Sequence, residues 1–255
     1  MTPKKSCNAA IILSVIAFMS LGCMADINLT AKTIKGNGNL ITKEISITDY
    51  DEIEIVGSID LNYQQLEEQP YFQITVDENI LEYLDIHVEN RVLYIQPVKI
   101  EAGNNRYDLH STKCIVNTNS KQLRGVDLSG SGNINLISDI QTDKLEFDLA
   151  GSAKVFSKKS ITAKELKIDL AGSGTISLKG NVETCEIDIA GSGKVISPEL
   201  SVKHLKCDIA GSGAIEIDVS ESIDCDIAGS GTLIYTGNPS SVKQDVAGSG
   251  RLIKK

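Results

Sequence analysis

Seven aspartates recur at intervals of 18 to 21 residues through the C-terminal half of the sequence. Each opens a segment Asp-apolar-Ala-Gly-Ser-Gly, with Ser129 in place of alanine in the first copy and Ala153 in place of the last glycine in the second. The seven are Asp127, Asp148, Asp169, Asp188, Asp208, Asp226 and Asp245. A period near twenty is typical of a solenoid, in which equivalent residues stack about 4.8 Å apart.

Carboxylates stacked at this spacing repel one another by about 1 kcal/mol in water, so the column needs compensation. One source is the Gly-Ser-Gly corner after each aspartate, because carboxylates accept backbone N–H bonds in turns. The other is a row of Ca²⁺ ions between coils, as in some glycine- and aspartate-rich solenoids. Those solenoids carry more Gly-Asp pairs per coil, so we expect corner hydrogen bonds, helped by nearby lysines, and predict no metal.

Catalytic chemistry has little support in the sequence. His87, His110 and His204 lack metal-site spacing, and no nucleophile elbow, P-loop, dinucleotide fingerprint or HExxH motif is present. Glu186 and Asp188 could imitate the carboxylate pair of a glycosidase, but both belong to repeating columns, and an active site should interrupt a repeat. We therefore predict no enzymatic activity and no cofactor; a polysaccharide-active β-helix enzyme is the less favoured alternative.

A second column, two residues before each aspartate, alternates in charge. It reads Glu146, Lys167, Glu186, Lys206, Asp224 and Lys243, after Gly125 in the first repeat. Opposite charges on neighbouring strands contribute about 0.2–1 kcal/mol a pair, and a one-residue slip of a coil would bury them. The pattern predicts an ion-pair ladder that fixes the register of the coils.

Two cysteines share one predicted inward column, one coil apart. Cys207 and Cys225 both stand one residue before an aspartate, which places them within reach of a disulfide. The sequence also fits the alternative that both are free thiols packed as small core residues, and this is the favoured interpretation.

The elements that must position these residues are short strands. Residues at odd offsets from each aspartate are apolar, except in the two terminal repeats, and period two indicates strands with one buried face. The two glycines of each corner permit positive φ and close stacking between strands. Because parallel crossovers are right-handed, residues 113–255 predict a right-handed parallel β-helix (β-solenoid) of about seven coils in an all-β protein.

Residues 44–112 form a β-rich N-terminal region by the same alternation, and 99–112 is the expected loop between the halves. Within it, 54–59 resembles a worn copy of the repeat that has lost one glycine. This resemblance predicts that the N-terminal strands wind in the same way as the later coils.

Residues 1–22 are predicted to be an export signal. Lys4 and Lys5 precede an apolar stretch from Ala9 to Met19 that is too short to span a bilayer. Cys23 follows Ser20-Leu21-Gly22, which resembles a lipobox and predicts a lipid anchor on Cys23; cleavage after Ala25 is the alternative and would give a secreted or periplasmic protein. Residues 23–43 are read as a leader and linker.

Loss of the signal would remove Lys4 and Lys5 and no acid, so the formal charge would fall from −9 to −11. So acidic a surface argues against nucleic acid and anionic headgroups as partners. The expected association with a membrane is through the lipid alone.

The sequence is similar to a known family, the putative auto-transporter adhesin head GIN domain, common in Bacteroides and its relatives. The resemblance covers nearly the whole mature chain: 36–38, 53–60, 91–95, 128–134 and the later repeats. It implies a β-helix and an adhesin in the cell envelope. The prediction is therefore a non-catalytic binding module on an outer-membrane lipoprotein, periplasmic or surface-exposed, whose ligand is a protein or glycan and whose oligomeric state stays open. The alternative is a structural or assembly component of the envelope.

Overall fold

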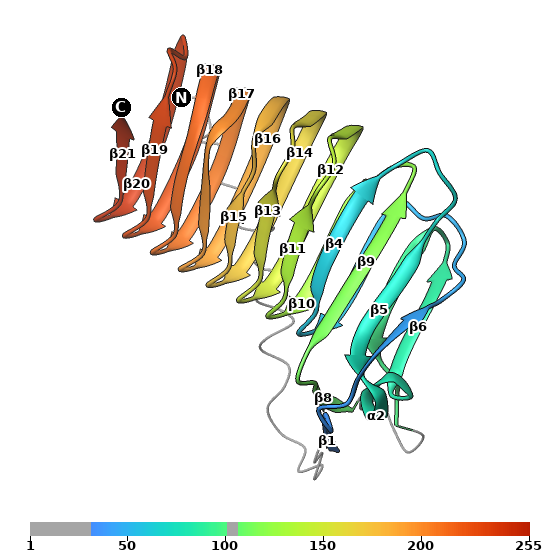
Figure 1. Ribbon diagram of the computed structural model, residues 1–255. Coiled ribbons are helices and arrows are strands. Elements are labelled where there is room, and N and C mark those ends of the chain that lie inside the picture. The colour runs from blue at the N-terminus through green and yellow to red at the C-terminus, as the bar shows by residue number, and fades with distance from the viewer. Residues whose placement is uncertain (1–31, 101–106) are drawn as a thin grey trace. The chain divides into compact units, whose positions relative to one another are not determined.

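The computed structural model describes residues 32–100 and 107–255, which form a parallel β-solenoid extended by antiparallel strands at its N-terminal end (Figure 1). The predicted signal segment and Cys23 lie outside the described residues. Seven strand segments carry the repeated aspartates, and six turns of the chain join them. The expected count of about seven coils equals the number of these segments and exceeds the number of turns by one.

Two rows of parallel strands run along the solenoid. The first, which we call the aspartate sheet, contains β3 (Glu52–Gly57), β10 (Gly125–Gly130), β12 (Ile140–Gly151), β14 (Ile161–Gly172), β16 (Gly180–Gly191), β17 (Lys194–Gly211), β18 (Ala214–Gly229) and β20 (Ser241–Gly248). The second sheet contains β4 (Asp60–Gln65), β11 (Asn133–Leu136), β13 (Lys154–Ser157), β15 (Thr175–Ser177), the first parts of β17 and β18, β19 (Thr232–Thr236) and β21 (Arg251–Lys254). The earliest parts of β12, β14 and β16 and a middle part of β17 pair along a short third side.

The N-terminal half continues both sheets. Its elements are β1 (Thr33–Lys35), β2 (Leu40–Glu44), β5 (Phe72–Asp77), α2 (Glu78–Leu81), β6 (Leu84–Glu89), β7 (Val92–Pro97), β8 (Asp108–His110) and β9 (Cys114–Ser120). In the aspartate sheet β7 runs parallel to β3, and β6 runs antiparallel to β7. In the second sheet β9 is parallel to β4, β5 is antiparallel to β9, and β2 is antiparallel to β5. β1 and β8 form a separate parallel pair.

The worn copy of the repeat is confirmed as a coil. Glu54 pairs in register with Asp127, and Gly57 pairs with Gly130 and shares its positive φ. The coil formed by β3 and β4 therefore stacks directly on the one formed by β10 and β11, although about 70 residues separate them in the sequence. Residues on both sides of position 112 thus contribute to the same two sheets.

Each corner uses its two glycines for different reasons. The first glycine has positive φ, for example +121° at Gly151, where an added Cβ would lie 2.2 Å from the carbonyl oxygen of Gly130. The second glycine leaves room for the core: a Cβ on Gly193 would lie 2.4 Å from Cδ2 of Leu170. Ala153 is buried at its equivalent position, so that corner accommodates a methyl group, and the buried Ile59 takes the same position in the β3–β4 corner.

The apolar columns point inward as predicted and form one continuous core along the solenoid. The last coil differs: Val242 is 41% and Val246 37% exposed, because no further coil covers β20 among the described residues. At the first full repeat, Arg124 is exposed and Leu123 fills the core in its place.

Candidate functional site

The seven predicted aspartates form one row across the aspartate sheet, each paired in register with the next. The expected hydrogen bonds from the corners to these carboxylates are not made in the described chain. Instead each corner serine donates its backbone N–H to the first glycine of the coil before, as Ser173 does to the Gly151 carbonyl at 2.9 Å. The prediction was wrong because stacked identical corners supply backbone acceptors for one another.

The carboxylates are therefore poorly compensated. Burial, aided by the charges of neighbouring acids, raises the pKa of Asp127 and of Asp188 to about 6, and raises the pKa of Asp148 and Asp226 as well. Oδ1 of Asp188 is buried without a hydrogen-bond partner. Lysine helps locally, since Lys167 forms an ion pair with Asp169. In the part of the chain that the structure describes, no group of three or more His, Cys, Asp or Glu is placed to hold a metal ion.

The alternating column two residues earlier is in register, but only part of it is ion-paired. Lys167 Nζ lies 3.4 Å from Glu146 Oε1, and Lys206 forms an ion pair with Glu186. Within the described residues, Lys167–Glu186 and the two steps around Asp224 form no ion pair. Lys167 contacts Glu146 and Asp169, and Lys206 contacts Glu186, so neither of these lysines pairs with the acid of the same column on the following coil.

Cys207 and Cys225 face each other in the core as thiols, with their Sγ atoms 2.7 Å apart. The three histidines lie far apart in the fold. His87, His110 and His204 each sit near a separate carboxylate, those of Asp85, Asp108 and Glu221. The structure therefore assembles no histidine cluster among the described residues.

The outer face of the second sheet carries a row of amides. Asn62 donates to Asn117 at 2.9 Å, and Asn135 donates to Asn62 at 3.1 Å. Phe156 follows Asn135 in the same row and is 39% exposed. Tyr235, on β19 of the same sheet, is only 7% exposed.

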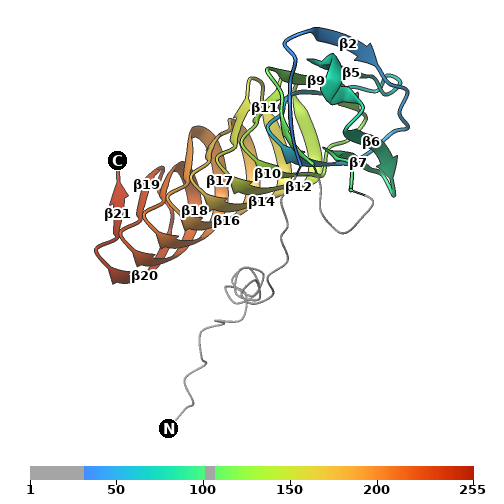
Figure 2. The ribbon, with the colours of Figure 1, turned by 90° about the horizontal axis from the view of Figure 1, so that it is seen from below.

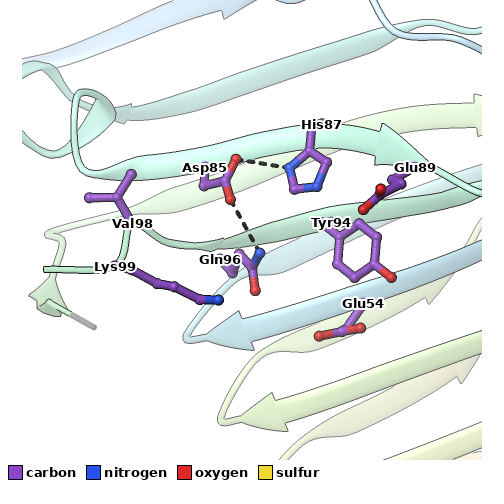
Figure 3. Close-up of a pocket in the computed structure, with 8 residues that line it drawn as sticks. All are labelled: Glu54, Asp85, His87, Glu89, Tyr94, Gln96, Val98 and Lys99. Atoms are coloured by element: carbon purple, nitrogen blue, oxygen red, sulfur yellow. Dashed lines mark hydrogen bonds and ion pairs between the residues drawn. The ribbon is translucent and has the colours of Figure 1, made fainter. Parts of the chain in front are cut away.

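The repeat is interrupted at the N-terminal end of the aspartate row. Beyond Asp127 the row continues through Glu54 to Tyr94 and ends at His87 on the outermost strand. A solvent-open hollow of about 440 Å³ lies here, which we call the β6–β7 hollow. It is lined by Glu54, Asp85, His87, Glu89, Tyr94, Gln96, Val98 and Lys99 (Figure 3).

Contacts within the β6–β7 hollow orient its side chains. The rings of His87 and Tyr94 stack with centroids 5.0 Å apart and an angle of 17° between their planes. One oxygen of Asp85 lies 2.8 Å from Nδ1 of His87, and the other accepts a hydrogen bond from Gln96 Nε2 at 3.2 Å. Burial and the nearby glutamates, Glu54 first among them, raise the pKa of Tyr94, so its hydroxyl stays protonated at neutral pH. The hollow thus combines an aromatic pair with an acidic rim.

The hairpin that builds the hollow follows from its local sequence. Alternation in 84–89 and 92–97 gives two strands, and Asn90 and Arg91 both have positive φ, as a two-residue type I′ turn requires. Arg91 is anchored by an ion pair with the buried Asp51, and this contact lowers the pKa of Asp51. Nη2 of Arg91 also lies 3.5 Å from Oδ2 of Asp49. Alternation predicted strands in this region, and His87 was named only as a histidine without metal-site spacing, so the sequence did not combine these residues into one site.

Comparison with known proteins supports the same architecture. The family described as "Putative auto-transporter adhesin, head GIN domain" matches residues 49–239. A solved structure from Parabacteroides distasonis, named a putative lipid binding protein, is 35% identical, with 88% of this chain and 100% of that chain covered and a TM-score of 0.75. A putative adhesin from Parabacteroides merdae is 33% identical over 88% and 100% of the two chains, with a TM-score of 0.62.

A putative adhesin from Bacteroides fragilis shares the fold at 22% identity, with a TM-score of 0.76 over 87% of this chain and 100% of that one. No curated protein matches the sequence. No helix in the described ranges combines the length and apolar character needed to cross a membrane. The solenoid, the worn first coil and the match over residues 49–239 agree, and the chain belongs to the putative auto-transporter adhesin, head GIN domain family.

Proposed function

We propose that the protein is a non-catalytic adhesion module held at the cell envelope, with the β6–β7 hollow as its ligand-binding site. The observation that carries this proposal is the position of the hollow: it lies where the regular columns stop and side chains of different kinds converge. A binding surface needs a place where side chains of different kinds converge, whereas the remaining columns repeat from coil to coil. Membership of an adhesin family supports the same conclusion.

The proposed attachment is a lipid on Cys23 after removal of residues 1–22. Metabolic labelling with an alkyne-bearing fatty acid should label the wild-type protein and leave Cys23→Ala unlabelled. Membrane fractionation should place the wild type with the outer membrane. An unlabelled wild-type protein whose mature N-terminus is Asp26 would overturn the anchor and show cleavage after Ala25 instead.

Adhesion itself is tested with the purified full-length mature protein on immobilised extracellular-matrix proteins and on a glycan array. We expect saturable binding to one class of ligand, reduced by substitutions in the hollow and unchanged by Glu199→Gln, an exposed acid on the solenoid. Binding that is unaffected by every substitution in the hollow would refute the proposed site. Absence of binding to all surfaces, by a folded protein, would refute adhesion.

A second candidate is a structural component that stacks through the end of its solenoid. The exposed Val242 and Val246 on β20 favour it, because they offer apolar surface beside unpaired strand edges. Lys254 and Lys255 oppose it, since they place positive charge on the same coil. Analytical ultracentrifugation over a range of concentrations separates the two: a stable monomer excludes stacking.

The relative named as a lipid binding protein suggests no third role for this hollow. Val98 is the one aliphatic residue in its lining, and the other lining residues are polar or aromatic. An acyl chain would therefore find little apolar surface there.

A further inference from the structure

The β6–β7 hollow is bordered by a free sheet edge. Among the described residues β6 pairs with β7 alone, and β6 lies at the outer rim of the aspartate sheet (Figure 2). In an antiparallel pair every second residue directs its N–H and C=O away from the partner strand. The outer side of β6 therefore presents backbone donors and acceptors to which another extended chain can pair.

The two faces of β6 differ in chemistry. Asp85, His87 and Glu89 line the hollow on the outer face. Leu84, Ile86 and Val88 point the other way and pack against the core, but remain partly exposed. A strand added to this edge would lay one set of alternate side chains beside the acidic face and the other set over the partly exposed aliphatic face.

The charge of the hollow selects the chemistry of that strand. Glu54, Asp85 and Glu89 face a single lysine, Lys99, and the acidic row continues from Glu54 to Asp127. The Tyr94 ring, which stacks against His87, adds an aromatic surface that attracts cations. Because none of these acids belongs to a metal-competent group among the described residues, an organic cation fits better than a metal ion.

We propose that β6 is the docking edge for an extended segment of a partner protein in which lysine or arginine alternates with apolar residues. The segment pairs with β6 as an additional strand, its basic side chains spaced about 6.8 Å apart, as are the outward side chains of β6. Its apolar side chains cover Leu84, Ile86 and Val88. This inference rests on the proposed adhesion function and names the class of its ligand.

A free strand edge favours a protein partner over a lipid or a glycan. Backbone pairing requires a partner with regularly spaced amide groups, which a polypeptide has and the other two lack. The cationic head of a zwitterionic lipid or an amino sugar would meet the same carboxylates, but would leave the edge of β6 unpaired. The test therefore separates edge pairing from simple charge attraction.

The experiment measures binding of three capped synthetic peptides to the purified mature protein by fluorescence anisotropy. The first alternates valine with lysine or arginine. The second replaces each basic residue by glutamate, and the third keeps the basic sequence but carries N-methyl groups on all of its backbone nitrogens, so that both of its edges are blocked. We expect saturable binding of the first peptide only, because the second loses the charge match and the third cannot pair along its full length.

Variants locate the site. Glu54→Gln and Glu89→Gln should each weaken binding of the basic peptide about two- to fivefold, as expected for cross-strand charge pairs. Glu199→Gln, which removes an exposed acid far along the chain, should leave binding unchanged and serves as the matched control. Binding should also weaken as salt is added, because exposed charge pairs are screened.

Several outcomes would overturn the inference. Equal binding of the basic and N-methylated peptides, or equal weakening by Glu199→Gln, would show attraction to the overall charge without pairing to β6. Binding of choline-headgroup vesicles or an amino-sugar polymer in place of the peptide would assign the hollow to another ligand. If the peptides fail while the protein still adheres to a surface, the ligand class is wrong and the adhesion function stands.

Discussion

Replacing Asp188 by asparagine should stabilise the protein at neutral pH, although the change removes a residue of a repeated motif. Asp188 lies between Asp169 and Asp208 in the aspartate row, with Glu186 on the same strand and Lys206 as the nearby cation. Its Oδ1 is buried without a partner. Folding therefore holds a charge where it is poorly solvated and repelled by its neighbours.

The magnitude follows from the pKa of Asp188, which burial and neighbouring acids raise from 3.8 to about 6. At about 1.36 kcal/mol per pKa unit this corresponds to a destabilisation of about 3 kcal/mol at pH 7. Asp188 is only half-buried, so solvent screening reduces the figure to about 1 kcal/mol. For a chain of this size that is a rise in Tm of about 2–4 °C for Asp188→Asn.

The pH dependence has a definite sign. A carboxyl whose pKa is raised on folding contributes stability that is fully present below about pH 3.8, where folded and unfolded chains are both protonated. That stability is lost as the pH rises to about 6 and stays lost above it. The wild type should therefore become more stable between pH 7 and pH 4, and Asp188→Asn should show a weaker dependence over this window.

Urea unfolding followed by far-ultraviolet circular dichroism, at several values between pH 4 and pH 8, measures both effects. Glu199→Gln is the control, because it removes an exposed acid outside the row. A variant that is less stable than the wild type at pH 7, or a stability difference that is the same at pH 4 and pH 8, would refute the argument that the row stores unfavourable charge.

Three further predictions concern the corners, the hairpin anchor and the core thiols. Gly151→Ala should lower the free energy of unfolding by about 2–3 kcal/mol, because its φ is +121° and the new Cβ would meet the Gly130 carbonyl oxygen. Chemical denaturation measures this free energy. A loss of stability no larger than that of Ala153→Gly would contradict the assigned backbone strain. Arg91→Ala should cost about 2 kcal/mol at pH 7, since Asp51 would remain buried without its cation. Because Arg91 lowers the pKa of Asp51, this loss should disappear as the pH falls below about 3.8, whereas a loss that persists in acid would point to packing alone. Mass spectrometry after alkylation in denaturant without reductant should find Cys207 and Cys225 modified as free thiols; unmodified cysteines that react only after reduction would show a disulfide.

Much of the solenoid could be predicted because its information is local and repeated. Alternating apolar residues indicate strands, glycines mark corners, and the period aligns the coils, so the inward columns and even the worn coil at 54–59 follow. The pairing of β2 with β5 and of β5 with β9 could not be predicted. These pairs join distant segments, and alternation alone gives every strand the same choice of partners.

Part of the β6–β7 hollow could be predicted from the sequence. Alternation around Asp85, His87 and Glu89, followed by Asn90-Arg91, is the pattern of a hairpin and predicts that these three side chains share a face. What the pattern lacks is the pairing of β7 with β3, which brings Glu54 beside Tyr94. The corner hydrogen bonds were mispredicted for a related reason: their acceptors belong to the preceding coil and appear only once the coils are stacked.

The segment from Gly36 to Gly38 is subject to another long-range constraint, which its local sequence does not reveal. Asp77 accepts hydrogen bonds from the backbone of Gly38 at 2.7 Å and of Thr112 at 2.6 Å. A Cβ on Gly36 would lie 2.4 Å from the Asp77 carboxylate, so glycine is needed there for close approach. The Gly36-Asn37-Gly38 segment reads as a simple turn, but its glycines serve an acid about forty positions away.

The alternating charges beside the aspartate row also restrict how the gene can change length. Near-identical repeats of about twenty codons invite recombination that deletes or duplicates whole coils. Loss of the Lys167 coil would place Glu146 directly against Glu186, whereas loss of the Lys167 and Glu186 coils together would place Glu146 against Lys206. Descendants that gain or lose coils in pairs keep opposite charges adjacent, so natural length variants of this solenoid should differ by even numbers of repeats more often than by odd ones.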